Sequence, residues 1–190
     1  STPKPSSAAS DVYKRQMHSY IYFVSYQFGC NSYPVVEGPF VYLSMHGRTV
    51  NASRGFFASV WQEYSLADSR WGVADPGIVA VELLTVVVKG PLALYTSWLV
   101  LKDNAKYHIW LCFLCLAELY GDYMTFVPEY FTNAAALDTQ NPLHLWFYLV
   151  ISNGAWVITP AYLLVKSTYA LVRMADASSV PPPPPPKKIV

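Results

Sequence analysis

The stretch VAVELLTVVVKGPLALYTSWLVL, from Val79 to Leu101, decides the fold of this chain. Its apolar run is long enough to cross bilayer hydrocarbon, which is roughly 30 Å thick, and Glu82 lies inside it. A carboxylate within hydrocarbon costs about 3 kcal/mol on insertion scales, so such a group is normally kept for a function. The stretch therefore predicts a membrane-spanning helix whose acid belongs to a functional site.

The composition of the whole chain is also that of a membrane protein. Of its 190 residues, 53% are hydrophobic, 16% are aromatic and only 13% are charged, whereas soluble domains have about 25% charged residues. A net charge of +1 gives no reason to expect a nucleic-acid partner. Cys30, Cys112 and Cys115 lie in apolar segments without a second CxxC pair or a histidine at ligand spacing. We expect these thiols to pack, and we expect no metal or cofactor.

Apolar runs of membrane-crossing length predict an all-α, polytopic transmembrane bundle with four visible spans. The predicted spans are Ser19–Leu43, Ile78–Leu101, Tyr107–Val127 and Leu143–Val165. Prolines inside the first span predict a kink or an early end, and Gly90-Pro91 predicts a kink within the second. Apolar residues at helical spacing in Phe56–Tyr64 predict a helix lying at the membrane interface.

The two ends of the chain differ from the part between them. DVYKRQ, at residues 11–16, resembles the translation of a sequencing adaptor, so we set residues 1–16 apart as a non-native or disordered leader. We predict a transmembrane domain over residues 17–172, followed by a disordered, proline-rich cytosolic tail over residues 173–190. The final KKIV resembles a dilysine retrieval signal of the endoplasmic reticulum, with a generic basic tail as the alternative.

Basic residues predict the orientation in the membrane. The 102–106 connector and the C-terminal tail carry lysines, so both are expected on the cytosolic side. The 45–76 and 128–142 segments are then lumenal, although 45–76 also contains arginines. A glycosylation sequon at Asn51 lies in this lumenal segment, and such sequons often occur by chance.

Polar residues inside the spans predict a cavity. With alternating spans, Glu37, Glu82 and Asp122 fall at similar depths in the lumenal half, and Asn153 falls nearer the midplane. Helical spacing puts the following pairs on shared faces: Glu82 with Thr85, Asn153 with Trp156, and Glu118 with Asp122. Such faces turn inward because lipid offers them no polar partners. We expect Tyr33, Thr85, Asp122, Tyr120 and Trp98 to contact a substrate in this cavity.

Two carboxyl groups and an aromatic ring in an apolar cavity suit the movement of a carbon–carbon double bond. One carboxylic acid donates a proton, a second carboxylate takes one, and a tryptophan face with an amide oxygen stabilises the cation between the steps. The alternative is that these polar groups only hold helices together, as intramembrane Asn and Thr residues commonly do. For Lys89, pairing with an acid and snorkelling along the kink both stay open.

Four motifs give the chain a resemblance to a known family. They are WQEYSLADSRW (61–71), VELLTVVVKGPLALY (81–95), LYGDYMTF (119–126) and NPLHLWFYLVISNGAWVITP (141–160). Together they resemble the emopamil-binding protein family, which holds the sterol Δ8–Δ7 isomerases and the wider EXPERA-domain membrane proteins. The resemblance covers about residues 33 to 172, and the motifs are specific in combination.

The resemblance implies a bundle of five spans in the endoplasmic reticulum, one more than is visible, so an N-terminal span is expected to be missing. It implies an isomerase that moves a sterol ring double bond from C8 to C7 through a C8 carbocation without a cofactor. On this match Glu37 and Glu82 transfer protons, while Asn153 and Trp156 support the cation. The site is also expected to bind cationic amines, and a homodimer stays open.

One departure from the family pattern favours a different class of function. The isomerases carry a histidine four residues before the acid of their E-G-x-F motif, and Tyr33 occupies that position here. A non-catalytic EXPERA protein that binds or traffics sterols is therefore the alternative to the isomerase. A third possibility is an unrelated four-helix transporter with an intramembrane acid, against which the co-occurring motifs argue.

Overall fold

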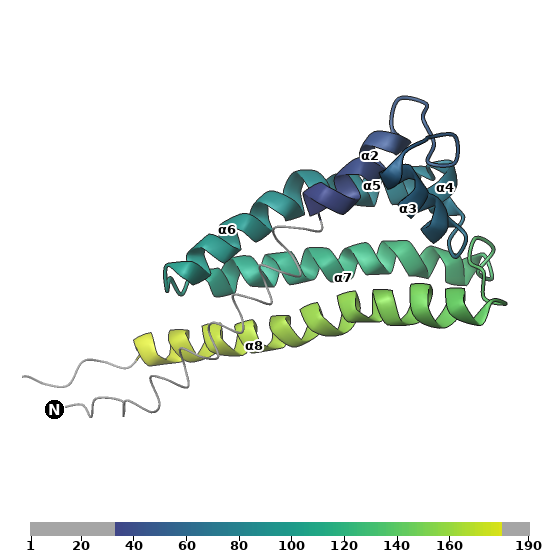
Figure 1. Cartoon of the computed structure of the whole chain (residues 1–190). Helices are drawn as coiled ribbons and strands as arrows, with labels where there is room; N and C mark the ends of the chain where they lie inside the picture. The colour runs from purple at the N-terminus through teal and green to yellow at the C-terminus, as the bar shows by residue number, and fades with distance from the viewer. Residues whose placement is uncertain (1–32, 180–190) are drawn as a thin grey trace, which may run out of the picture.

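The computed structural model describes residues 33–179, and every regular element in this range is helical (Figure 1). The elements are η1 (Tyr33–Glu37), α2 (Gly38–Ser44), α3 (Phe56–Ser65), α4 (Arg70–Val73), α5 (Pro76–Leu84), η2 (Thr85–Lys89), α6 (Gly90–Leu101), α7 (Tyr107–Phe131), η3 (Leu143–Ser152) and α8 (Asn153–Ser179). Those labelled η are π-helical segments. The predicted all-α fold class is confirmed.

Three continuous helices in the described range are long and apolar enough to cross a membrane. They comprise Pro76–Leu101, Tyr107–Phe131 and Leu143–Ser179. These helices confirm the second, third and fourth predicted spans. Much of the first predicted span, together with the leader, lies outside the described residues; its described part forms η1 and α2.

The second span begins at a well-defined cap and is interrupted at its middle. The Asp75 side chain accepts hydrogen bonds from the N–H groups of Gly77 and Ile78, and Pro76 occupies the first turn, where a missing N–H is harmless. Pro91 has no N–H to donate within the helix, and the turn before it widens into η2, where the Gly90 N–H bonds to the Thr85 carbonyl. The interruption predicted at Gly90-Pro91 is therefore a π turn.

The third and fourth spans are longer than the sequence analysis predicted. Helix α7 continues through Pro128 to Phe131, where a loop was expected, because Glu129 ties the helix end to the following segment. The Glu129 carboxylate accepts the Ala136 N–H at 2.9 Å, and its carbonyl accepts the Ala134 N–H. Helix α8 continues to Ser179, beyond the predicted start of the tail at residue 173, because the sequence ALVRMADA consists mostly of good helix formers.

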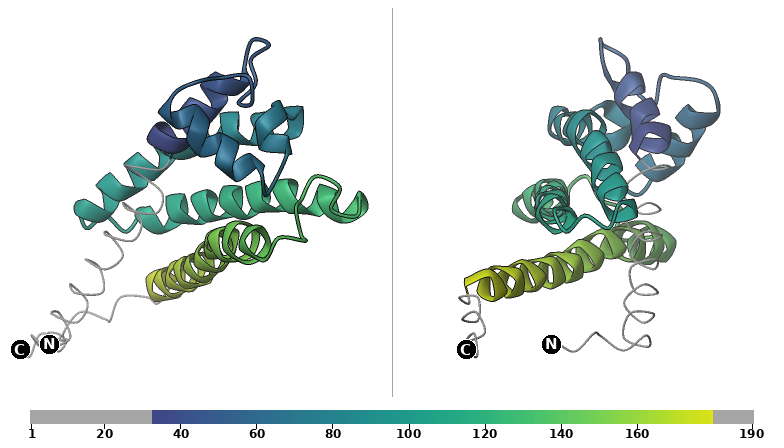
Figure 2. Two further views of the ribbon diagram at one scale, coloured as in Figure 1. Left: turned by 45° about the vertical axis from the view of Figure 1, so that its right-hand side comes forward. Right: turned by 90° about the vertical axis from the view of Figure 1, so that its left-hand side faces the viewer.

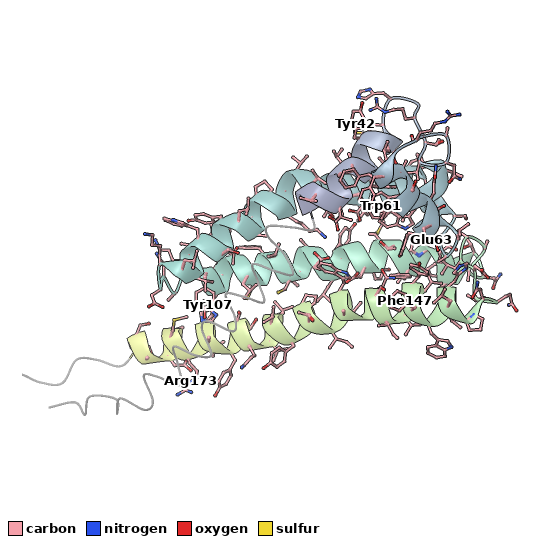
Figure 3. The ribbon with its side chains drawn as sticks, viewed as in Figure 1. Tyr42, Trp61, Glu63, Tyr107, Phe147 and Arg173 are labelled. Carbon is pink, nitrogen blue, oxygen red and sulfur yellow. The ribbon has the colours of Figure 1, made fainter. Side chains whose placement is uncertain are left out.

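The long helices lie side by side and alternate in direction (Figures 1 and 2). Helix α7 lies between α8 and the α5–η2–α6 span, while α2, α3 and α4 gather at one end. We call this the loop end, formed by residues 45–75 and 132–142; the opposite end holds the 102–106 connector. Trp61 and Glu63 lie at the loop end, and Tyr107 lies at the connector end (Figure 3). Which end faces the cytosol stays a prediction.

Two apolar clusters hold the bundle together. One joins α6, α7 and α8 and includes Leu99, Leu111 and Leu163. The other, at the loop end, is aromatic: the rings of Trp61 and Trp71 are stacked with their centroids 4.8 Å apart, and Phe40 packs against both. This cluster fixes the interfacial helix predicted at Phe56–Tyr64, which the structure extends by one residue to Ser65 as α3.

Candidate functional site

A buried ionic network holds the loop end in place. Arg70 bonds to both carboxylate oxygens of Asp68, at 2.9 and 2.6 Å, and reaches Glu129 of α7 at 3.4 Å. Burial by itself lowers the pKa of the Arg70 guanidinium, but the hydrogen bond and charge of Asp68 outweigh this effect and raise it overall. Backbone hydrogen bonds from Ser69 to Ala136 and from Asp138 to Ala67 complete the connection. The D-S-R motif therefore joins α4 to α7.

A cavity of about 590 Å³ lies where this end meets the spans. Its volume falls within the roughly 300–1,000 Å³ of small-molecule sites. The chain contributes residues from η1, α3, α4, α5, η2, α7, η3 and α8, so all of the described spans meet there. The predicted site residues that line it are Glu37, Glu82, Thr85, Asp122, Asn153 and Trp156.

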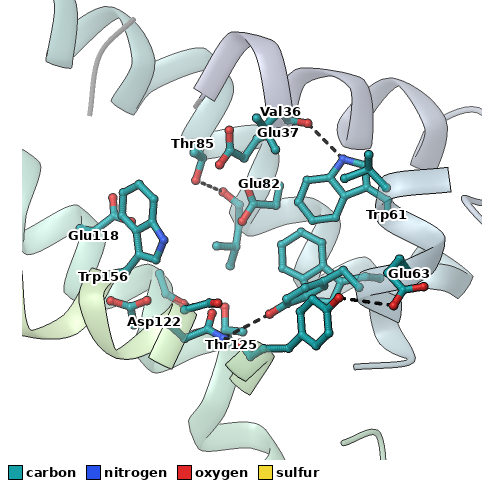
Figure 4. A pocket seen from close by; sticks show the side chains of 18 of the residues that line it. Val36, Glu37, Trp61, Glu63, Glu82, Thr85, Glu118, Asp122, Thr125 and Trp156 are labelled. Atoms are coloured by element: carbon teal, nitrogen blue, oxygen red, sulfur yellow. Dashed lines mark hydrogen bonds between the residues drawn. The ribbon is translucent and has the colours of Figure 1, made fainter. Parts of the chain in front are cut away.

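Three carboxyl groups reach the cavity from three different elements. Glu37 comes from η1, Glu82 from α5 and Asp122 from α7. One oxygen of each is buried without a hydrogen-bond partner among the described residues. Figure 4 shows Glu37 and Glu82 near Thr85, with Asp122 on another side of the cavity. A buried polar atom without a partner is costly, which points to a ligand or a transferable proton at this place.

Neighbouring groups set the position of Glu37. The indole N–H of Trp61 donates to the Val36 carbonyl at 3.1 Å, which attaches η1 to α3 next to this acid (Figure 4). Trp61 is itself held by its stacking on Trp71. The aromatic cluster at the loop end therefore positions a cavity carboxyl group.

Asn153 and Tyr64 form a hydrogen-bonded part of the cavity wall. The Asn153 amide donates to the carbonyls of Tyr148 and Leu149, at 2.7 and 3.1 Å, and to the Tyr64 hydroxyl at 3.3 Å. No hydrogen bond among the described residues involves Asn153 Oδ1, which is therefore available to a ligand. Burial raises the pKa of the Tyr64 hydroxyl to about 12, so this group stays protonated at neutral pH.

Lys89 and Glu118 form an ion pair in the cavity wall. The Lys89 Nζ lies 2.8 Å from Glu118 Oε2, and both side chains are buried. This pairing decides between the two possibilities that the sequence left open for Lys89. Sequence reasoning put Glu118 on an inward face with Asp122 but did not assign Lys89 to the cavity, although helical spacing puts Lys89 on the face of Glu82 and Thr85. Tyr64, Trp61 and Lys89 are the main cavity residues it missed.

Three residues expected to contact the substrate are not placed at the cavity. Trp98 and Tyr120 do not line it, and their side chains are 51% and 56% exposed. Tyr120 turns away because neighbouring residues of an α-helix point about 100° apart, and its neighbour Gly121 faces the cavity. Trp98 lies on the outer face of α6, stacked on Tyr95. We remove both from the candidate site, while the Tyr33 side chain lies outside the described part of the structure.

Comparisons with known proteins find a family model and curated relatives that match this chain. The family model described as EXPERA (EXPanded EBP superfamily) matches residues 56–167. A relative from Oryza sativa subsp. japonica, named as a probable 3-beta-hydroxysteroid-Delta(8),Delta(7)-isomerase, is 33% identical over 70% of this chain and 59% of its own length. A 3-beta-hydroxysteroid-Delta(8),Delta(7)-isomerase from Cavia porcellus is 29% identical over 70% of this chain and 57% of its own length.

A further relative carries a different name. The isomeliandiol synthase of Melia azedarach is 30% identical over 60% of this chain and 53% of its own length. The chain thus spans somewhat more than half of the length of these curated relatives. The match to the family model covers most of α3 to α8, which include every described span and most of the cavity. This chain belongs to the EXPERA family, the expanded EBP superfamily of membrane proteins.

Proposed function

We propose that this protein is a 3β-hydroxysteroid Δ8–Δ7 isomerase. The observation that carries the proposal is the meeting of Glu37, Glu82 and Asp122 around one cavity, each with a buried oxygen lacking a hydrogen-bond partner among the described residues. The cavity has a suitable volume for a small apolar ligand, and relatives named as this isomerase match the chain.

The reaction needs only proton transfer. A carboxylic acid protonates C9 of the C8=C9 double bond, and the electron pair of the π bond forms the new C–H bond, leaving a cation at C8. A carboxylate then removes a proton from C7, and the released electron pair forms the C7=C8 bond. Atoms and electrons balance without a co-reactant. We assign the two proton transfers to Glu37 and Glu82, which lie near one another at the cavity (Figure 4).

The intermediate cation requires a negative or polarisable surface. Trp156 lines the cavity together with Glu118 and Asp122, so its indole face is a suitable partner for the cation (Figure 4). Asn153 Oδ1 supplies a second electron-rich group while its amide N–H₂ is held by the Tyr148 and Leu149 carbonyls. Thr85 and Asp122 complete the proposed substrate contacts.

Expression in cells that lack their own Δ8–Δ7 isomerase tests this proposal. We expect accumulated Δ8-sterols to fall and Δ7-sterols to appear, because the chain supplies the missing proton transfers. Sterol profiling by gas chromatography and mass spectrometry measures both pools, with protein level and membrane insertion checked in parallel. Persistent Δ8-sterols in the presence of folded protein would contradict the isomerase.

A sterol-binding protein without catalysis is the second candidate, favoured by Tyr33. A phenol at this position cannot exchange protons near neutral pH as an imidazole can. The same expression experiment separates the two candidates when it is combined with sterol binding to the purified protein. Binding of Δ8-sterols without any change in their amounts supports the second candidate.

Replacing Trp156 by Leu should weaken binding of cationic amines more than binding of neutral sterols. The change keeps an apolar side chain but removes the aromatic face, which contributes up to about 2 kcal/mol to a desolvated cation. We expect amine affinity to fall about tenfold relative to neutral sterol affinity, as measured by competition binding in detergent. Equal losses for both ligand classes would remove Trp156 from the cation-stabilising role.

The endoplasmic-reticulum membrane is the proposed location. Helices of membrane-spanning length and the sterol-isomerase names of the relatives support this placement. The KKIV sequence that suggests a retrieval signal lies outside the described residues, as does most of the proline-rich tail. Substrate sterols and inhibitory cationic amphiphiles are the proposed partners within the membrane, and a homodimer is left open.

A further inference from the structure

The charges around the cavity are strongly unequal. Among the described lining residues Lys89 alone is basic, whereas five are acidic: Glu37, Glu63, Glu82, Glu118 and Asp122. A cavity of this kind in a low-dielectric environment attracts any cation that fits its shape. Sterols are neutral, whereas cationic amphiphiles gain from this charge excess, so the balance of charge around the cavity sets the relative affinity of the two ligand classes.

The single cation is placed where it can counter this excess. Lys89 ends η2 and lies on the same helical face as Glu82, while Glu118 comes from the facing helix α7. Both partners of the 2.8 Å ion pair are buried, Lys89 being 4% exposed and Glu118 7% exposed. Water therefore screens the pair little, and its charges act across the cavity.

Other charged groups face Lys89 from several elements. Glu37 from η1, Glu82 from α5 and Asp122 from α7 each interact electrostatically with both Lys89 and Glu118. Gly121, one turn along α7 from Glu118, lies next to the lysine, since a Cβ added there would be in ordinary van der Waals contact with Lys89 Nζ at 3.6 Å. The described residues thus put one ammonium among four carboxyl groups of the cavity wall.

We propose that Lys89, held by Glu118, is a specificity-determining residue that lowers the affinity of the site for permanent cations and so favours neutral sterols. This inference rests on the proposed sterol-binding function and deepens it. The Lys89 charge cancels that of Glu118. The remaining acids are then left to stabilise the C8 cation, which exists only during the reaction. A ligand with a standing positive charge meets the repulsion of the ammonium throughout binding.

Two matched ligands test the proposal: a steroid carrying a quaternary ring ammonium, whose charge does not depend on pH, and its neutral carbon analogue. The measured quantity is the ratio of their affinities for the purified full chain at pH 8.5. Lys89→Met should raise the preference for the cation about tenfold, because Glu118 then lacks its counter-charge. Glu118→Gln should lower this preference about tenfold, because the ammonium charge is no longer cancelled.

Two variants separate charge from structure. The double variant Lys89→Met/Glu118→Gln removes both charges, so its ratio should return to within about threefold of the wild type. Lys89→Arg keeps the positive charge and should retain the wild-type ratio. Lys102→Met removes an exposed lysine of the connector and serves as the matched control. Loss of packing weakens the binding of both ligands, so it cannot change the affinity ratio in opposite directions in the two single variants.

Each outcome decides between the proposals. Ratios that stay unchanged, or that move in the same direction in both single variants, overturn the role of Lys89. Should Lys89→Met fail to fold, Glu118→Gln decides alone, since its amide can still accept a hydrogen bond from Lys89. If the variants show the expected affinity ratios but the wild-type chain leaves Δ8-sterols unchanged, the isomerase is refuted and this inference is supported. A wild-type chain that binds neither steroid overturns both.

Discussion

Replacement of Glu82 by Gln is expected to reduce sterol isomerisation about 1,000-fold, within the range for loss of a general acid or base. The amide keeps the size of the side chain but can neither give nor take a proton at neutral pH. Glu82 reaches the cavity from α5, and its buried Oε2 has no hydrogen-bond partner among the described residues. Conversion of a Δ8-sterol by membranes containing equal amounts of each protein measures the loss.

Binding distinguishes this effect from misfolding. We expect the affinity of the Glu82→Gln variant for the neutral steroid to stay within about threefold of the wild type, because the amide fills the same volume. Asp103→Asn changes an exposed acid in the connector and is the matched control, with unaltered conversion. Wild-type kinetics for Glu82→Gln would exclude proton transfer by this residue. The proton transfers would then have to be assigned to the other cavity acids.

Replacement of Arg70 by Met is expected to destabilise the fold by about 3–5 kcal/mol, the usual cost of removing one partner of a buried ionic network. Asp68 is fully buried and Glu129 is nearly so, and both lose their bonds to the guanidinium. The midpoint of thermal unfolding should fall by roughly 10 °C or more for a chain of this size. Unfolding of the purified protein in detergent, followed by circular dichroism, measures this shift.

A nearby arginine provides the comparison. Arg54 lies exposed in the same part of the chain, so Arg54→Met should change the unfolding midpoint by no more than about 1 °C. Double replacement of Arg70 by Met and Asp68 by Asn should recover part of the lost stability, because it removes a buried charge left without its partner. Equal midpoints for Arg70→Met and Arg54→Met would show that the network does not stabilise the loop end.

The sequence predicted the spans and most of the acids because both depend on local patterns. Apolar runs of membrane length identified the three described spans, and helical spacing put Glu82 with Thr85 and Asn153 with Trp156, which all line the cavity. The end of α7 was not accessible in this way, because it depends on the bonds that Glu129 makes to the following loop. The end of α8 follows from helix propensity after residue 172, which the predicted start of the tail at residue 173 overlooked.

The aromatic residues show where sequence reasoning was weakest. Membrane helices carry tyrosine and tryptophan on lipid-facing surfaces as well as inside, so their presence does not say which way they point. Tyr120 and Trp98 face outward, whereas Trp61 and Tyr64 of α3 line the cavity. Only the packing of α3 against η1 and α4 decides this, through contacts between residues distant in sequence.

The π turn at η2 has a consequence for comparing this chain with its relatives. A turn closed by a bond from the Gly90 N–H to the Thr85 carbonyl holds one residue more than an α-helical turn. In a homologue with an uninterrupted α-helix here, one residue fewer between the acid that corresponds to Glu82 and the Gly-Pro pair puts both at the same positions along the helix axis. Alignments that forbid single-residue gaps within helices would then misregister every position on one side of the turn.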